Sequence, residues 1–447
     1  MEYLPHTRAD VEEMLEVIGL DSISDLFEAV PENVKLGRPL DVPPALDEVS
    51  LAAHLKELAG RNKGAGDLTC FAGGGAYDHY VPAAARSLAS RGEFTTSYTP
   101  YQPELSQGVL QAVFEFQTHV CELYGMEVAN ASLYDGASSL VEAVNLACRT
   151  TKRDRVVVAG TIHPHYLEVL KTYTSGLGIT IDTIPWTDEG TLDLGSVTLD
   201  AAAAVACQHP NFFGRLEDLQ ALSDAAHTAG ALSIAVTDPT AMGVLASPGD
   251  LGADVAVGEG QAFGNSLSYG GPYVGLFATK LQHVRQVPGR IAGETLDRDG
   301  NRAYVLTLQA REQHIRRAKA TSNVCTNQTL MAIAATIHLS WLGPRGLERM
   351  GHLCLAKTRA AAERLAEVPG CEIRFAGPVF KEFVLRTPVP TRPLLRSLAA
   401  QGFLAGPALG RWFPQLDDCL LVSATERRTT EDIERFAEAL EKELAGR

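Results

Sequence analysis

The sequence predicts an α/β fold with a mainly parallel, doubly wound sheet, preceded by a helical arm and followed by a smaller α+β domain. First, short apolar runs alternate with helical segments from about residue 130 to about residue 280. Second, these runs are apolar throughout, which is typical of strands buried on both faces. Third, the alternation is missing at both ends of the chain. We therefore expect an arm over residues 1–60, a large domain over 61–320 and a small domain over 321–447.

The arm is expected to be helical. Thr7 and Asp10 stand at capping-box spacing before an amphipathic run, and Gly19 follows it as a stop signal. Residues 22–30 form a second candidate helix, which Pro31 ends.

The large domain is expected to contain an amphipathic helix over residues 105–124. Strands are expected in six apolar runs, at residues 155–160, 179–184, 202–207, 232–237, 254–257 and 273–278, with a helix over 215–229. In such a sheet the site lies beyond the carboxyl ends of the strands. The small domain is expected to hold a helix over 330–342, two strands within 371–387, and a final strand and helix in which Thr429 and Asp432 are spaced as a cap.

Composition narrows the class of protein. The chain has 447 residues, 45% of them hydrophobic, and a net charge of −15, which disfavours binding to nucleic acid. It has no signal-peptide pattern and no apolar run long enough to span a membrane. Eight scattered cysteines form no C-x-x-C pair, so a reduced, cytoplasmic protein is expected. His163 and His165 flank a proline, but nothing nearby completes a ligand set, and no metal is expected.

Several strand ends and one helix start carry candidate site residues. Asp135 and Ser138 open a helix whose free amides would suit an anion, although an ordinary cap explains them equally well. Asp238 follows a strand and would suit a protonated pyridine nitrogen, or serve as a turn residue before proline. His209 follows another strand, where it would stack on a flat ring or simply belong to the loop.

Two loops stand out. Residues 258–273, "GEGQAFGNSLSYGGPY", join two apolar strands with glycines and hydroxyls but contain no Lys, Arg or His. Residues 94–108, "FTTSYTPYQPELSQG", combine hydroxyl groups with prolines that stiffen the backbone. Tyr98, Thr99, Tyr101 and Gln102 are its candidate binding residues, and a surface loop anchored by buried tyrosines is the alternative.

Five strings together resemble a known family. They are "FAGGGAYDHYVP", "FTTSYTPYQPELSQG", "YDGASSLVEA", "LSYGGPYVG" and "RRAKATSNVCTNQ". The chain resembles the P-protein (glycine decarboxylase) family of the glycine cleavage system, over nearly its whole length. The resemblance implies the architecture of pyridoxal-phosphate-dependent transferases of aminotransferase type, fold type I. The chain's length is similar to the N-terminal half of the single-chain form, which implies subunit 1 of a split, two-subunit form.

The resemblance also explains the loop without a lysine. In the family's other half a lysine at this strand end carries the cofactor, and Gln261 stands at the matching position here. An amide nitrogen cannot form a Schiff base. The nearest lysine, Lys280, lies beyond the next strand and is expected to point away. Asp135, Ser138, His209 and Asp238 would then be remnants of a degenerate cofactor pocket.

The resemblance implies an oxidoreductase that works as a complex. A lysine-bearing second subunit would bind pyridoxal phosphate and glycine, carbon dioxide would leave, and the aminomethyl group would pass to the lipoyl arm of the H protein. This chain would complete the active site at the interface, in a heterodimer or a dimer of heterodimers. The alternatives are an independent pyridoxal-phosphate-dependent decarboxylase or lyase, and a purely structural partner subunit.

Overall fold

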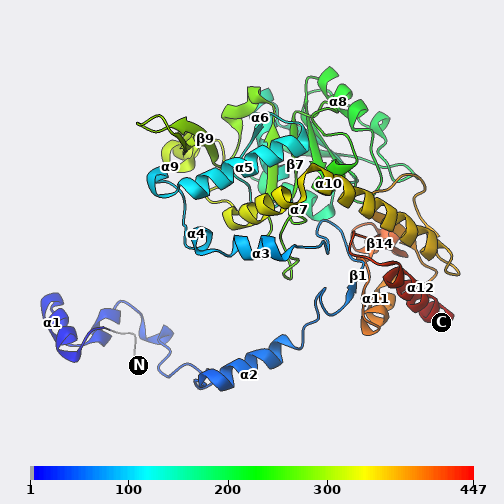
Figure 1. Cartoon of the computed structure of the whole chain (residues 1–447). Helices are drawn as coiled ribbons and strands as arrows, with labels where there is room; N and C mark the ends of the chain where they lie inside the picture. The colour runs from blue at the N-terminus through cyan, green and yellow to red at the C-terminus, as the bar shows by residue number, and fades with distance from the viewer. Residues whose placement is uncertain (1–4, 447) are drawn as a thin grey trace. The chain divides into compact units, whose positions relative to one another are not determined.

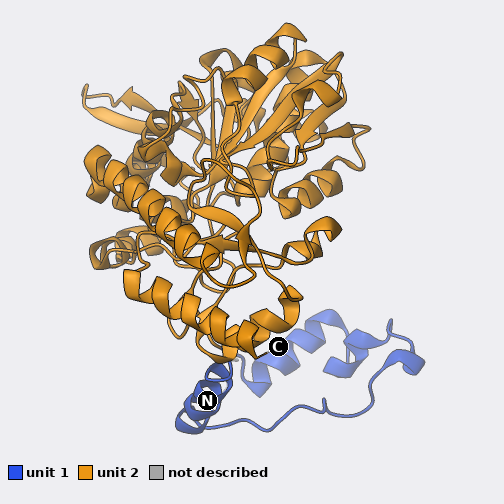
Figure 2. Ribbon diagram, turned by 90° about the vertical axis from the view of Figure 1, so that its right-hand side faces the viewer, with its two compact units in different colours: residues 1–62 blue, residues 63–447 orange. Residues whose placement is uncertain are grey.

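The computed structural model describes residues 5–446 and divides the chain into two compact units, residues 1–62 and residues 63–447 (Figure 2). Within the first unit the expected capping box is confirmed: Thr7 and Asp10 cap helix α1, and Gly19 ends it in a left-handed conformation. The second expected helix is only a short 3-10 helix, Ile23–Phe27. The unit's α-helices are α1 (Arg8–Ile18) and α2 (Glu48–Ala59), and no residue of either is buried.

The second unit is built around a seven-stranded sheet of order β2-β8-β7-β6-β5-β3-β4. The strands are β2 (Val128–Ala129), β3 (Arg155–Ala159), β4 (Thr180–Ile184), β5 (Ala202–His209), β6 (Leu232–Thr237), β7 (Val255–Glu259) and β8 (Gly275–Thr279). The five from β7 to β4 are parallel, whereas β8 runs antiparallel to both its neighbours. All six strands expected from the apolar runs are present, and the mostly parallel fold is confirmed.

Helices surround this sheet (Figure 1). Helix α6 packs against β5 to β8 and α8 against β5 and β6, so the central strands are apolar throughout because helices cover them. The helices of the unit are α3 (Ala83–Ala89), α4 (Gly92–Thr95), α5 (Gln107–Tyr124), α6 (Gly136–Thr151), α7 (Pro164–Thr174), α8 (Leu219–Thr228), α9 (Gln313–Arg316), α10 (Thr329–Ala366), α11 (Thr391–Ala400) and α12 (Thr430–Ala445). Helix α10 is longer than the sequence predicts and bends at Gly343, which has a positive φ.

The C-terminal part of this unit has its own antiparallel sheet of order β11-β12-β14, with strands β11 (Glu372–Ile373), β12 (Glu382–Arg386) and β14 (Cys419–Ser423). Apolar residues of these strands and of α10, α11 and α12 form a second core. The expected pair of strands and the Thr429–Asp432 cap of α12 are confirmed. Two smaller pairings complete the fold: a hairpin of β9 (Ile291–Leu296) with β10 (Arg302–Thr307), and β1 (Thr69–Cys70) alongside β13 (Phe403–Leu404).

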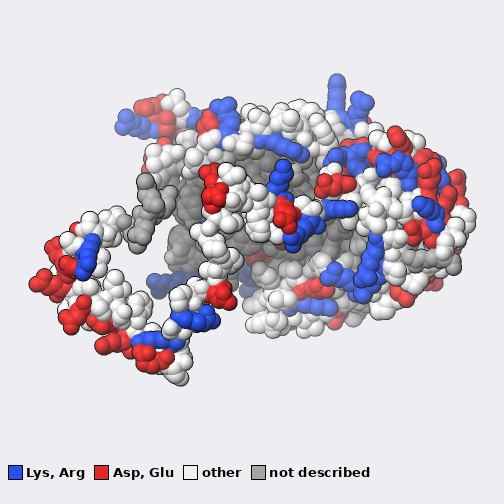
Figure 3. Space-filling view, turned by 90° about the horizontal axis from the view of Figure 1, so that it is seen from below, with Lys and Arg blue, Asp and Glu red and all other residues white. Residues whose placement is uncertain are grey.

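The surface carries charges of both signs. Basic and acidic side chains are interspersed on the face drawn in Figure 3. Among the helices within residues 5–446, none combines the length and apolarity needed to cross a bilayer.

Candidate functional site

A small cavity lies at the carboxyl ends of β5, β6 and β7, where a doubly wound sheet places its site. Its volume is about 30 Å³. It is lined by Gly75, Tyr77, His163, Tyr166, Gln208, Val236, Thr237, Asp238, Pro239, Glu259, Gln261, Ala262 and Lys381. These residues come from the ends of the three strands, the start of α7, the glycine-rich loop over residues 71–80, and the residue before β12.

Asp238, directly after β6, forms an ion pair with Lys381. The lysine side chain is 1% exposed and its Nζ lies 3.5 Å from the centre of the Tyr77 ring. Burial opposes ionisation of Asp238, but the ammonium group prevails and holds its pKa below the ordinary value. Breaking such a buried pair by removing one partner costs about 3–5 kcal/mol, because it leaves an uncompensated charge. Lys381 also has a φ of 63°, a left-handed conformation that costs a non-glycine residue about 1–2 kcal/mol.

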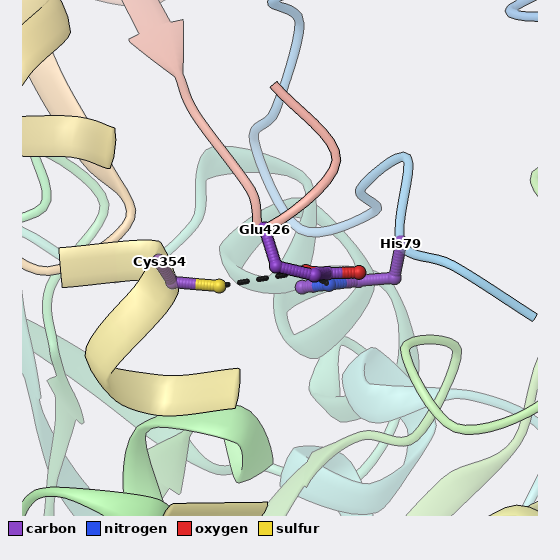
Figure 4. Close-up of side chains that lie close together, drawn as sticks. All are labelled: His79, Cys354 and Glu426. Carbon is purple, nitrogen blue, oxygen red and sulfur yellow. Dashed lines mark hydrogen bonds and ion pairs between the residues drawn. The ribbon is translucent and has the colours of Figure 1, made fainter. Parts of the chain in front are cut away.

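The ammonium group of Lys381 continues into a chain of buried contacts. It lies 3.2 Å from His79 Nε2, and His79 Nδ1 lies 2.7 Å from Glu426 Oε2. Figure 4 shows the imidazole and the carboxylate facing each other, with the Cys354 thiol of α10 directed at the same carboxylate, 3.6 Å away. Burial raises the pKa of Glu426, but His79 outweighs it and lowers that pKa to about 2.

His79, Cys354 and Glu426 have the donor types of a metal site. However, both ring nitrogens of His79 already face a partner, and one partner is the Lys381 cation. The cluster is therefore better described as a hydrogen-bonded chain that ends at Asp238.

Glu259, the last residue of β7, also lines the cavity. Its carboxyl group accepts hydrogen bonds from three backbone N–H groups: Gly136 at 3.0 Å, and Gln261 and Val274, both at 3.1 Å. Gly136 is the first residue of α6, so Glu259 occupies a free amide at a helix N-terminus. Burial raises the pKa of Glu259 to about 8, although these N–H groups act in the opposite direction.

Gln261 is 2% exposed and fixed by its own amide. Its Oε1 accepts from Tyr77 N at 2.9 Å, and its Nε2 donates to the carbonyl groups of Tyr77 at 3.1 Å and Asn265 at 2.8 Å. Because every hydrogen bond of the side chain goes to the backbone, Gln261 holds the glycine-rich loop against the end of β7. The position expected for a cofactor lysine is thus occupied by a structural amide.

The glycine-rich loop is closely packed. A Cβ atom on Gly73 would lie 2.2 Å from Glu382 Oε1, and one on Gly75 would lie 3.0 Å from the His163 ring. Glu382 in turn accepts hydrogen bonds from Gly74 N at 2.5 Å and from the Tyr77 hydroxyl at 2.8 Å. These positions need glycine because Glu382 of β12 approaches Gly73 and His163 at the start of α7 approaches Gly75.

Four other residues considered in the sequence, Asp135, Ser138, His209 and Lys280, do not line the cavity. Asp135 and Ser138 form the reciprocal cap of α6. His209 points away from the cavity, since Gln208 lines it and successive side chains of a strand alternate; its Nδ1 accepts from Glu217 N at 3.1 Å. Lys280 forms an ion pair with Asp254 at the opposite end of β7, so it does point away.

The loop over residues 94–108 forms a separate hollow of about 660 Å³. All four of its candidate residues, Tyr98, Thr99, Tyr101 and Gln102, line this hollow. Tyr98 is 87% exposed and Tyr101 is 46% exposed, so neither serves as a buried anchor.

Arg290, which the sequence gave no reason to select, contacts Tyr101, one of the residues that line this hollow. It is buried and donates to the Tyr101 hydroxyl at 3.0 Å and to the Cys325 carbonyl at 2.7 Å. Cys325 N donates to the Tyr134 hydroxyl at 3.3 Å. Three of the five family-like strings therefore meet here, although they are far apart along the chain.

Lys381 and Glu259 were also missed. Each is an ordinary charged residue beside a strand, and only the folded contacts distinguish it from a surface residue.

The chain matches known proteins over nearly its whole length. Residues 1–440 match the family described as "Glycine cleavage system P-protein". A protein of Moorella thermoacetica named "Probable glycine dehydrogenase (decarboxylating) subunit 1" is 49% identical over the whole of both chains. One of Desulforamulus reducens with the same name is 49% identical, covering 98% of this chain and 99% of its own.

Solved structures show the same fold. A glycine decarboxylase (P-protein) of the glycine cleavage system, in inhibitor-bound form, is 44% identical with a TM-score of 0.90, covering 99% of this chain and 100% of its own. A sphingosine-1-phosphate lyase of Burkholderia pseudomallei is only 14% identical, with a TM-score of 0.66, covering 93% of this chain and 95% of its own, and it supports the fold alone. With a family match over nearly the full length and relatives close to half identical, this chain belongs to the glycine cleavage system P-protein family.

Proposed function

We propose that this chain is subunit 1 of a split glycine decarboxylase and acts only with a lysine-bearing second subunit. The complex decarboxylates glycine and transfers the aminomethyl group to the lipoyl arm of the H protein, in the cytoplasm. The observation that carries the proposal is Gln261, a buried amide where the cofactor lysine is expected. The names of the full-length relatives include the words "subunit 1", which supports an enzyme built from two different subunits.

The cavity of this chain does not fit pyridoxal phosphate. It offers no lysine able to form a Schiff base at the end of β7, and its volume of about 30 Å³ holds about two water molecules. In this proposal the partner subunit holds pyridoxal phosphate, which supplies the electron sink for loss of carbon dioxide.

The chain's own contribution is a wall at the subunit interface. Tyr98, Thr99, Tyr101 and Gln102 line an open hollow, and Arg290 fixes the Tyr101 hydroxyl from behind. Hydroxyl and amide groups on a stiff loop can orient a small carboxylate without adding net charge. Glycine has no side chain to grip, so its selection depends on such polar contacts in a tight space.

The first unit supplies a second reason to expect a partner. Apolar side chains of residues 5–62 are exposed: Met14, Val17, Ile18, Ile23, Leu26, Phe27, Val30, Val34, Leu36, Leu40, Val42, Leu46, Val49, Leu51, Leu55 and Leu58. Exposed apolar surface of this extent is typical of a segment that packs against a further folded surface, and in this proposal the second subunit supplies that surface.

The test is reconstitution. The purified chain is assayed for glycine decarboxylation and for glycine–bicarbonate exchange with H protein, alone and after mixing with the lysine-bearing subunit. We expect activity only in the mixture. Turnover by the chain alone would refute the proposal and favour an independent decarboxylase.

Gln261→Lys provides the companion measurement. We expect it to leave the single chain inactive, because the cavity has no room for a cofactor beside the new lysine. An active Gln261→Lys chain would show that the pocket still accepts the cofactor and would overturn this account of it.

A further inference from the structure

We infer that this chain fills its own cofactor site with two of its side chains. The ammonium group of Lys381 takes the place of a protonated pyridine nitrogen beside Asp238, and the carboxyl group of Glu259 takes the place of a phosphate at the N-terminus of α6. The inference concerns residues of this chain alone and does not depend on the partner subunit.

The Lys381 ammonium group makes the contact with Asp238 that a protonated pyridine nitrogen would make. Asp238 needs a cation that is shielded from water, and the Lys381 ammonium group provides one at 1% exposure. Its Nζ also lies over the Tyr77 ring and donates to Thr240 Oγ1 at 3.2 Å, so each of its neighbours suits a buried cation. A second cation at this position would have to displace the lysine.

The carboxyl group of Glu259 makes contacts that a phosphate would make at the N-terminus of α6. Free amides at a helix N-terminus attract anions, and phosphate is their common ligand. Here the amide of Gly136 donates to Glu259 Oε2, while Oε1 accepts from two further backbone N–H groups. Asp135 caps a further amide of this first turn, at Ser138, so two of the amides at the start of α6 already donate to carboxyl groups of this chain.

The two side chains line the same small cavity, whose remaining volume is about 30 Å³. Asp238 and Gln261 line it as well. The pairing also joins the end of β6 to the residue before β12, so it ties the main sheet to the C-terminal sheet. The Lys381–Asp238 ion pair thus links the two sheets through the same carboxylate that would suit a pyridine nitrogen.

The first experiment measures ligand binding by the single chain. The probe is pyridoxine 5′-phosphate, whose alcohol cannot react with surface lysines as an aldehyde would, and inorganic phosphate is the control ligand. Binding is followed by equilibrium dialysis and by melting temperature with ligand up to about 1 mM. The wild type should not bind pyridoxine 5′-phosphate at up to this concentration. The double variant Glu259→Ala, Lys381→Ala should bind it at least tenfold more tightly than the limit that this sets for the wild type.

Lys280→Ala is the matched control, because Lys280 also pairs with a buried aspartate but lies outside the cavity. It should gain no affinity for the probe. Binding by the wild type as tight as by the double variant would overturn the inference. So would a folded double variant that binds no better than the wild type.

A second measurement keeps the test decisive if the double variant fails to fold. Lys381→Met and Asp238→Asn should each lower the melting temperature by several degrees, since each leaves a buried charge unpaired. Their combination should recover most of the loss. Additive losses would show that Lys381 and Asp238 do not act as a pair, and would refute the substitution of lysine for the pyridine nitrogen.

Discussion

Tyr98→Phe provides the sharpest test of the interface loop. The side chain is 87% exposed, so losing one hydroxyl should change the free energy of unfolding of the isolated chain by less than about 0.5 kcal/mol. In the assembled enzyme the same hydroxyl would face substrate or cofactor in a closed space. Leaving its hydrogen-bond partner unpaired there costs about 1–3 kcal/mol, which lowers kcat/KM by roughly 5- to 150-fold.

Tyr101→Phe serves as a comparison, because its hydroxyl already accepts a hydrogen bond from Arg290 at 3.0 Å. That variant should also lose about 1 kcal/mol of stability in the isolated chain. Tyr173→Phe, an exposed tyrosine on α7 outside the hollow, should change neither quantity.

Glycine turnover with H protein and the melting temperature are measured on the same preparations of the reconstituted complex. Wild-type turnover in both Tyr98→Phe and Tyr101→Phe would refute the role of this loop in the active site. Loss of stability with normal turnover would leave the loop as a structural element.

The remaining predictions concern assembly, packing and pH. Deleting residues 1–30 should weaken co-purification with the second subunit on dilution while the melting temperature of the large unit is kept; full co-purification would exclude the arm from the interface. Gly73→Ala should cost about 1–3 kcal/mol in thermal unfolding, because its Cβ would lie 2.2 Å from Glu382 Oε1, and an unchanged melting temperature would contradict this packing. The pKa of Glu259 is about 8 in the folded chain against an ordinary 4.5, so the folded state keeps a proton that the unfolded state loses between these values. This group's contribution to stability is therefore present below about pH 4.5 and declines as the pH rises towards about 8. In the Glu259→Gln variant the melting temperature should fall less steeply between about pH 4.5 and pH 8 than in the wild type, whatever the variant's overall stability. An unchanged slope would show that Glu259 does not titrate in this range.

Six of the seven strands of the large sheet were predictable because each lies in a short, mostly apolar run between turn residues; β4 is the least apolar of them and is only partly buried. The cap of α1 and the cap of α12 were predictable because they depend on residues three apart. The expected helix over residues 22–30 was shorter than predicted, a single 3-10 helix over Ile23–Phe27, with no buried residue to extend it. Strand β2 was missed because two residues carry no periodicity.

The candidate site was predictable only in part. The sequence alone determined that the loop after β7 contains no lysine, and the family resemblance implies that Gln261 stands at the position of the cofactor lysine. It also marked Asp238 as a carboxyl group at a strand end. It did not reveal that His209 points away from the cavity, because the direction of a strand side chain depends on which neighbour faces inward.

The tertiary structure alone decided what occupies the cavity. Lys381 reaches Asp238, and Glu259 reaches the first amide of α6, across long stretches of chain. No local pattern marks such contacts, because a lysine before a strand or a glutamate at its end is most often solvated. Folding removes water from these groups, and a buried charge or polar group then requires a partner. The sequence shows that the loop after β7 has no lysine, but only the folded chain shows which side chains fill the cavity.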